Sequence, residues 1–237
     1  MTSRADLDIT DAGSIRRAFA GLQPWAVINA AGFVRVAEAP AMRDRCFAEN
    51  TTGPALLAAA CAERGLPFVT FSSDLVFDGG VGRPYLENDP TNPLCAYGAS
   101  KSEAERLVSA AWDKSLIIRT SAFFGPWDRY HFLWNTLHRL HRGETVTASP
   151  KERVSPTYVP DLVNGALDLL LDGEKGIWHL TNQGEISWLD LAREAAKQAK
   201  LDAKLILAAG ESVAKSTALT TGRGLLLPSL DAALAAY

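Results

Sequence analysis

Short apolar runs and helical patterns alternate through the first half of the chain. The apolar runs at residues 25–29, 67–72 and 115–120 contain no regular polar alternation, which predicts strands buried on both faces of a sheet. The helices predicted before and between these runs cover residues 11–22, 42–64 and 96–112. Because strands that alternate with helices form crossover units, this half predicts an α/β fold with a doubly wound parallel sheet.

The pattern changes after Gly125 and Pro126. The helices predicted beyond this point cover residues 130–142, 160–171, 187–199 and 230–235, and the strands cover residues 145–148 and 177–180. These elements predict a first domain at residues 1–125 and a smaller α/β lobe at residues 126–237. No linker rich in Pro, Gly or Ser separates the two parts, so we expect one continuous core with a cleft between them.

Composition excludes several classes of protein. The 237 residues carry a net charge of -3, with 47% hydrophobic and 22% charged residues, which is typical of a soluble globular protein and not of a non-specific nucleic-acid binder. No apolar run reaches the roughly 18 residues of a membrane span, and the first residues lack the apolar stretch of a secretory signal. Cys46, Cys61 and Cys95 form no CxxC motif, so we interpret them as reduced thiols in a cytoplasmic protein.

The strongest chemical signal is the pair formed by Tyr97 and Lys101. Because they are four residues apart on a predicted helix, they share one face of it. A nearby ammonium favours the phenolate, so the pair predicts a tyrosine with a lowered pKa that can give a proton to a carbonyl oxygen. Ser73 follows a predicted strand, where its hydroxyl would bind the same oxygen. The alternative interpretation is a packed tyrosine, an exposed lysine and a serine that caps a turn.

Five segments follow one another with a specific order and spacing. They are Val27-Ile-Asn-Ala-Ala-Gly32, Asn50-Thr-Thr-Gly53, Phe71-Ser-Ser-Asp-Leu-Val-Phe-Asp-Gly79, Tyr97-Gly-Ala-Ser-Lys101 and Arg119-Thr-Ser121. Over nearly the whole chain, these segments resemble the extended short-chain dehydrogenase/reductase family, and within it the dTDP-4-dehydrorhamnose reductases. The resemblance implies a Rossmann-like dinucleotide-binding domain at residues 1–125 and a mainly substrate-binding lobe at residues 126–237.

The resemblance also implies a reaction and a role for individual residues. The reaction is the NAD(P)H-dependent reduction of a 4-keto sugar nucleotide in carbohydrate biosynthesis. Tyr97 would protonate the keto oxygen, Lys101 would lower the pKa of Tyr97 and bind the nicotinamide ribose, and Ser73 would polarise the carbonyl. The implied cofactor contacts are Asp8, Ile9, Ala30, Ala31, Gly32, Ser72, Tyr97, Lys101 and Ser121.

The chain departs from the family pattern at several positions. The Gly-rich turn that binds the pyrophosphate is missing, so we expect a fragment of a longer protein, or a chain completed by another segment or in a homodimer. Leu75 and Ala122 stand where the family has a tyrosine and a tryptophan of the sugar pocket, and Cys95 stands where it has an asparagine. These changes leave the identity of the sugar open.

Two alternatives concern function and metal binding. A non-catalytic sugar-nucleotide-binding or regulatory module is the alternative to an enzyme, because the phosphate-binding turn is missing and the sugar pocket is altered. His131, His138 and His141 recur on one predicted helix. No cysteine or second carboxylate joins them in a recognisable spacing, so we predict no metal site. The choice between NADH and NADPH stays open, and no nucleic-acid or membrane partner is expected.

Overall fold

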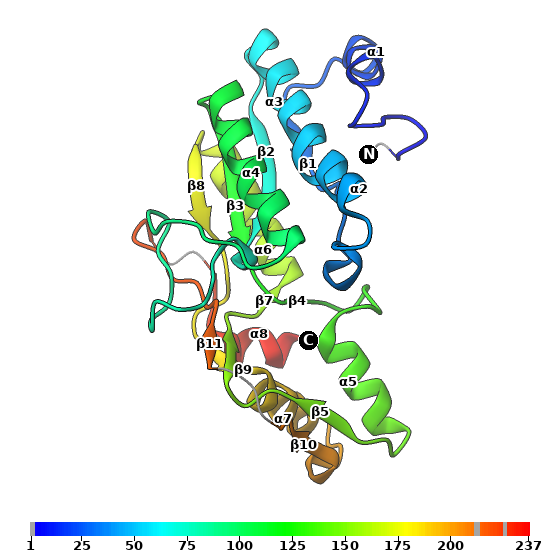
Figure 1. The fold of residues 1–237 in the computed structure, drawn as a ribbon, viewed down its shortest axis with the longest axis vertical. Helices are drawn as coiled ribbons and strands as arrows, with labels where there is room; N and C mark the ends of the chain where they lie inside the picture. Colours follow the sequence, from blue (N-terminus) through cyan, green and yellow to red (C-terminus); the bar gives the residue numbers. More distant parts are fainter. Residues whose placement is uncertain (1–2, 211–213, 225–226) are drawn as a thin grey trace. The chain divides into compact units, whose positions relative to one another are not determined.

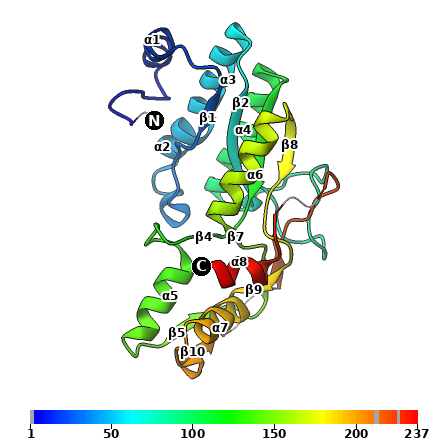
Figure 2. The same ribbon diagram turned by 180° about the vertical axis from the view of Figure 1, so that it is seen from behind.

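The chain divides into two compact units (Figure 1, Figure 2). The computed structural model describes residues 3–210, 214–224 and 227–237. The first unit combines Met1–Phe77, Pro90–Arg119 and Asp168–Trp178. The second unit combines Asp78–Asp89, Thr120–Leu167 and His179–Tyr237. Each unit is therefore assembled from segments that are far apart in the sequence.

A four-stranded sheet forms the centre of the first unit, in the order β1-β2-β3-β8. The strands are β1 (Val27–Asn29), β2 (Phe68–Ser73), β3 (Ser115–Thr120) and β8 (Gly176–His179). β1 and β2 run parallel, with Val27 opposite Phe68. Every residue of β3 is buried, as expected for a strand covered on both faces. The parallel pairing confirms the predicted α/β class.

Three helices bury their apolar faces in the core of the first unit: α1 (Ala12–Leu22), α3 (Gly53–Arg64) and α4 (Ala96–Ala111). Ile15 of α1, Leu57 of α3 and Val108 of α4 belong to one buried cluster. The side chain of Asp11 accepts a hydrogen bond from the backbone N–H of Gly13, so this residue is the N-cap of α1 as its type predicts. α3 and α4 lie side by side in front of the sheet in Figure 1.

The helix predicted at residues 42–64 is present from Arg43 to Arg64, with a different hydrogen-bond pattern in its middle. It consists of α2 (Arg43–Phe47), a π-helical turn η2 (Ala48–Thr52) and α3. Within the turn, Asn50 and Thr51 are buried and their side chains bond to groups outside the turn. A π-turn widens the helix by one residue, and such turns are common where polar side chains are needed at a site. The predicted helix is therefore found, and the π-turn within it was not predicted.

In its described residues, the second unit is built from short strands and four helices. Its strand pairs are β4 (Phe123–Phe124) with β7 (Thr157–Tyr158), and β5 (Val146–Ala148) with β10 (Ile206–Ala208). β6 (Glu152–Val154) lies between β11 (Lys215–Ser216) and β9 (Ile186–Ser187). The helices are α5 (Phe132–His141), α6 (Val159–Leu171), α7 (Trp188–Gln198) and α8 (Leu230–Ala236). α6 continues from the second unit into the first. Short helical turns complete the fold at η1 (Val36–Glu38), η3 (Asp74–Val76) and η4 (Ala203–Leu205).

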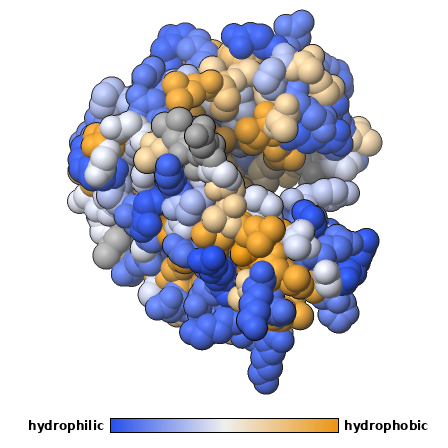
Figure 3. Space-filling view, turned by 60° about the horizontal axis from the view of Figure 1, so that its bottom comes forward, coloured by the Kyte–Doolittle hydropathy of each residue, from blue (hydrophilic) through white to orange (hydrophobic). Residues whose placement is uncertain are grey.

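The surface mixes polar and apolar side chains. Figure 3 shows apolar groups next to hydrophilic ones over one face of the molecule. The exposed apolar residues of the first unit include Leu22, Trp25, Ile28 and Val34. Among the described residues, no helix has the length and hydrophobicity that crossing a membrane requires.

Candidate functional site

The start of α4 packs directly against the turn that follows β2. Cys95 caps α4, with its Sγ accepting a hydrogen bond from the backbone N–H of Gly98 at 3.3 Å. A Cβ atom on Gly98 would lie 2.0 Å from the carbonyl oxygen of Leu75 in η3. No side chain fits in that space, so Gly98 permits an approach of the two backbones that brings Tyr97 to the end of β2.

Ser73, Tyr97 and Lys101 meet at this end of the sheet. The hydroxyl of Ser73 accepts from the backbone N–H of Leu75 at 3.1 Å and donates to Asp74 Oδ1 at 3.0 Å, and it also bonds to the phenol of Tyr97. Lys101 Nζ lies 5.9 Å from the centre of the Tyr97 ring. The ammonium donates a hydrogen bond to the carbonyl oxygen of Phe71 at 3.0 Å. The structure therefore brings together the three residues predicted to be catalytic.

The pKa of Tyr97 differs in direction from the sequence-based prediction. Burial of the phenol raises its pKa above the ordinary value, and the Asp74 carboxylate adds to this effect. The hydrogen bond with Ser73 opposes the increase. The predicted net decrease in the pKa of Tyr97 is therefore not found, because the free-energy cost of removing a phenolate from water exceeds the stabilisation that its neighbours provide. That Lys101 by itself favours the phenolate stays a prediction.

Lys101 is affected by the same enclosure. Burial lowers the pKa of its ammonium to about 8, and Cys46 and Glu105 oppose the decrease. The reason is that burial disfavours the charged form, which is the protonated form of a lysine and the deprotonated form of a tyrosine. The two members of the pair thus shift in opposite directions.

The end of β1 passes beside Lys101. The side chain of Asn29 accepts a hydrogen bond from the backbone N–H of Ala31 at 3.1 Å, which shapes the turn after the strand. A Cβ atom on Gly32 would lie 2.7 Å from Asn50 Oδ1 and 3.7 Å from Lys101 Nζ. Gly32 therefore leaves space next to the ammonium that any other residue type would fill.

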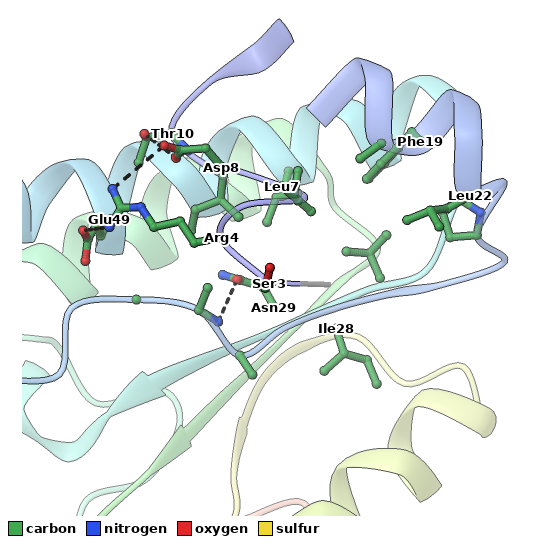
Figure 4. Close-up of a pocket in the computed structure, with 18 of the residues that line it drawn as sticks. Ser3, Arg4, Leu7, Asp8, Thr10, Phe19, Leu22, Ile28, Asn29 and Glu49 are labelled. Atoms are coloured by element: carbon green, nitrogen blue, oxygen red, sulfur yellow. Dashed lines mark hydrogen bonds and ion pairs between the residues drawn. The ribbon is translucent and has the colours of Figure 1, made fainter. Parts of the chain in front are cut away.

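A cavity of about 660 Å³ opens in the first unit next to this turn. Five of the predicted cofactor contacts line it: Asp8, Ile9, Ala30, Ala31 and Gly32. Figure 4 shows its polar side, where Arg4 reaches between Asp8 and Glu49. Hydrogen bonds from Thr10, and to a smaller extent the charge of Arg4, hold the pKa of Asp8 below its ordinary value. The opposite wall is apolar and includes Phe19 and Leu22.

The two remaining predicted cofactor contacts are both buried. The hydroxyl of Ser72 donates a hydrogen bond to Glu105 Oε1 at 2.5 Å, so its proton is engaged by a partner within the protein. Ser121 follows β3 in the second unit, and its hydroxyl has no hydrogen-bond partner among the described residues. Ala122 next to it has a positive φ of 43°, which is an unusual conformation for a residue other than glycine. The cofactor role of Ser121 stays a prediction.

Sequence reasoning assigned no role in the site to three buried polar residues that lie around it: Asn50, Glu105 and Arg119. Asn50 joins two neighbours: its Oδ1 accepts from the Phe33 backbone N–H at 2.8 Å, and its Nδ2 donates to Ser100 Oγ at 3.1 Å. Glu105 and Arg119 form an ion pair whose side chains are only 6% and 2% exposed. A signal existed for Asn50, because it opens one of the five segments that resemble the family.

His131 serves as a helix cap in the second unit. Its Nδ1 accepts a hydrogen bond from the backbone N–H of Trp134 at 3.1 Å. Its Nε2 lies 2.9 Å from the carbonyl oxygen of Gly125, so both ring nitrogens have partners within the protein. The ring of His138 stacks on Trp134, with centroids 4.7 Å apart. His131 therefore caps α5, and His138 takes part in packing on its surface.

Comparisons with known proteins identify the family. The model of the RmlD substrate binding domain matches residues 1–220. The chain is 35% identical over 192 residues to a dTDP-4-keto-6-deoxy-D-glucose reductase of Streptomyces niveus, covering 81% of this chain and 66% of that one. It is 35% identical over 197 residues to a dTDP-4-dehydrorhamnose reductase of Streptomyces griseus, covering 81% of this chain and 64% of that one. The chain thus spans slightly less than two thirds of the length of these relatives.

Solved structures agree with this assignment. The dTDP-4-dehydrorhamnose reductase of Bacillus anthracis in complex with NADP superposes with a TM-score of 0.92 at 25% identity, covering 98% of this chain and 86% of that one. The structure of a dTDP-4-dehydrorhamnose reductase from Clostridium acetobutylicum superposes with a TM-score of 0.93 at 28% identity, covering 100% of this chain and 88% of that one. The resemblance predicted from five segments is confirmed, and the chain belongs to the RmlD substrate-binding-domain family of Rossmann-like extended short-chain reductases.

Proposed function

We propose that this chain carries the catalytic site of an NAD(P)H-dependent reductase of 4-keto sugar nucleotides. The observation that carries the proposal is the meeting of Ser73, Tyr97 and Lys101 beside the space left by Gly32. Relatives at 35% identity are named reductases of dTDP-linked 4-keto-6-deoxy sugars, which supports the same class of substrate here. The reaction would belong to carbohydrate biosynthesis.

Tyr97 is the proton donor in this proposal. Its raised pKa keeps the phenol protonated at neutral pH, so it has a proton to give to the keto oxygen of the sugar. With substrate bound, the hydroxyl of Ser73 would turn from Asp74 to donate a hydrogen bond to the same oxygen and would stabilise the negative charge that develops there. The ammonium of Lys101 adds positive charge beside the phenol and lowers the free energy of the phenolate left after proton transfer.

The residues around the cavity fit a dinucleotide cofactor. The cavity of about 660 Å³ has a polar side at Asp8 and an apolar wall, as an adenosine requires, and it continues to the alanines of the β1 turn and Gly32. Gly32 leaves room for a group next to Lys101, which would bind the nicotinamide ribose. When bound, NAD(P)H supplies the hydride for reduction of the carbonyl carbon.

We further propose that residues 126–237 mainly select the sugar. Outside this range, Leu75 and Ala122 stand where the family pattern has a tyrosine and a tryptophan, so the sugar is expected to differ in size or polarity from the rhamnose precursor. The three cysteines are all free thiols, which supports a reducing cytoplasmic compartment.

The variant Tyr97→Phe tests the proposal. It removes the proton donor and keeps the ring, so kcat should fall by about 10²–10⁴-fold while the Kd for NADPH changes little. The measurement is NADPH oxidation with dTDP-4-keto-6-deoxy-D-glucose and with related dTDP-, UDP- and GDP-linked ketones. Unchanged turnover in the variant contradicts the role of Tyr97. Binding of a sugar nucleotide without turnover by the natural chain would instead support a non-catalytic binding module.

A further inference from the structure

A buried ion pair that the proposed reaction does not use lies one helical turn beyond Lys101. Glu105 of α4 accepts two hydrogen bonds from Arg119 of β3: Nε to Oε1 at 2.8 Å and Nη2 to Oε2 at 2.7 Å. Both side chains are almost fully buried. Ser72 of β2 donates its hydroxyl to the same carboxylate. Glu105 thus links α4 to two neighbouring strands of the sheet.

The placement of Glu105 connects this link to the proposed catalytic pair. Tyr97, Lys101 and Glu105 are spaced four residues apart, so they lie along one face of α4. Lys101 bonds to the carbonyl of Phe71 and Glu105 bonds to the hydroxyl of Ser72, which are consecutive residues of β2. Two side chains one turn apart therefore attach α4 to one strand. Two attachment points restrict both sliding and rotation of a helix, whereas one point restricts neither fully.

We propose that Glu105 is a positioning residue for the Tyr97–Lys101 pair, and that its attachment to Ser72 and Arg119 sets the register of α4 on the sheet and the charge state of Lys101. The proposal rests on the proposed function. Stability alone does not explain why the Glu105–Arg119 ion pair is buried, because the desolvation cost of such a pair often cancels its contribution to the free energy of unfolding. A role in positioning the catalytic pair does explain it.

The electrostatic part of the proposal follows from the groups that face Lys101. These are Tyr97 and Glu105 on α4, Cys46 on α2 and the carbonyl of Phe71 on β2. The carboxylate of Glu105 favours the protonated lysine and opposes the effect of burial. Without this carboxylate, Lys101 should lose its proton at a lower pH.

The variant Glu105→Gln keeps the size of the side chain and removes its charge. Its kcat should fall by about 10- to 100-fold, because a small displacement of the acid pair is costly, while KM for the sugar nucleotide changes little. The alkaline limb of the kcat profile should move to lower pH, since the protonated Lys101 is the active form. The same shift should appear in the pH dependence of Lys101 acylation by acetic anhydride, measured by mass spectrometry without substrate.

The matched control lies on the same helix. Glu103 pairs with Arg106 at 2.6 Å, and both side chains are well exposed. Glu103→Gln should leave kcat, its pH profile and the acylation of Lys101 unchanged. If Glu105→Gln behaves like this control in all three measurements, the proposal is wrong.

A double variant covers the case in which Glu105→Gln does not fold. Glu105→Leu with Arg119→Met removes both buried charges together, and such replacements are frequently neutral for stability. A folded double variant with low kcat and a downward shift of Lys101 titration supports positioning. If the double variant has the kcat of the natural chain and Lys101 loses its proton at the same pH as in the natural chain, the ion pair serves folding only and the proposal is wrong. If the natural chain itself has no turnover, the proposed function fails, while the acylation data still decide whether Glu105 sets the charge of Lys101.

Discussion

The burial of Lys101 should make the free energy of unfolding of the protein depend on pH. Its pKa is 10.5 when unperturbed and about 8 in the folded chain. Between these values the unfolded chain binds more protons than the folded chain, so the free energy of unfolding should rise with pH from about 8 to about 10.5. Below about pH 8 both states are protonated and the contribution of this residue is constant.

The measurement is urea unfolding at several pH values for the natural chain and for Lys101→Met. Methionine keeps the length of the side chain and does not titrate, so the rise with pH should be smaller in the variant. Other groups, such as Cys61 with its raised pKa of about 12, titrate in both proteins and cancel in the difference. Identical slopes for the two proteins would contradict a lowered pKa of Lys101.

Helix α4 depends on one glycine for its position. In a helix interior, replacing glycine by alanine usually stabilises a protein by about 0.5–1 kcal/mol. Gly98→Ala should do the opposite, because the new Cβ would lie 2.0 Å from the carbonyl oxygen of Leu75. A loss of about 1–3 kcal/mol in the free energy of unfolding is expected, together with a lower kcat as Tyr97 moves.

Gly21 in α1 provides the control for this prediction. Apart from its chain neighbours and the backbone of its own helix, a Cβ atom there has no described atom within 4 Å. Gly21→Ala should therefore raise the free energy of unfolding by about 0.5–1 kcal/mol. Thermal and urea unfolding of both variants give the comparison. A Gly98→Ala protein as stable as Gly21→Ala would show that α4 and η3 can separate at little cost.

Binding of the cofactor should stabilise the folded chain and raise its Tm. A ligand that binds only the folded state and is present at about 100 times its Kd adds about 2.7 kcal/mol to the free energy of unfolding. For a chain of this length that increase raises Tm by about 5–10 °C. NADPH and NADH should be tested separately, and the cofactor with the larger effect is the preferred one.

Gly32→Ala is the variant that should lose this response. Its Cβ would approach Asn50 Oδ1 to 2.7 Å and occupy the space beside Lys101. The shift in Tm caused by NADPH, measured relative to the variant without NADPH, should shrink or disappear, while Gly21→Ala should keep the full shift. If NADPH shifts the Tm of Gly32→Ala as much as that of the natural chain, the cofactor does not bind next to Gly32.

The two units illustrate how contacts between distant segments build the molecule. Residues 83–93 look like a plain loop in the sequence, yet Tyr85 and Glu87 are buried in the second unit. The backbone N–H of Tyr85 donates to the carbonyl oxygen of Ala218 at 2.8 Å, and Glu87 accepts from the backbone N–H of Gly222 at 3.1 Å. Partners more than 130 residues away leave no local pattern, so their pairing could not be predicted.

Local regularities determined the features that the sequence predicted correctly. Apolar runs and helix caps identified the strands and helices of the parallel sheet, because both depend on neighbouring residues. The spacing of Tyr97 and Lys101 placed them on one face of α4 for the same reason. Contacts across the fold determined the rest: the π-turn at Asn50, the pairing of Glu105 with Arg119, and the direction in which the pKa of Tyr97 moves. The physical reason is that burial and ion pairing depend on distances between segments, and only the folded chain establishes those distances.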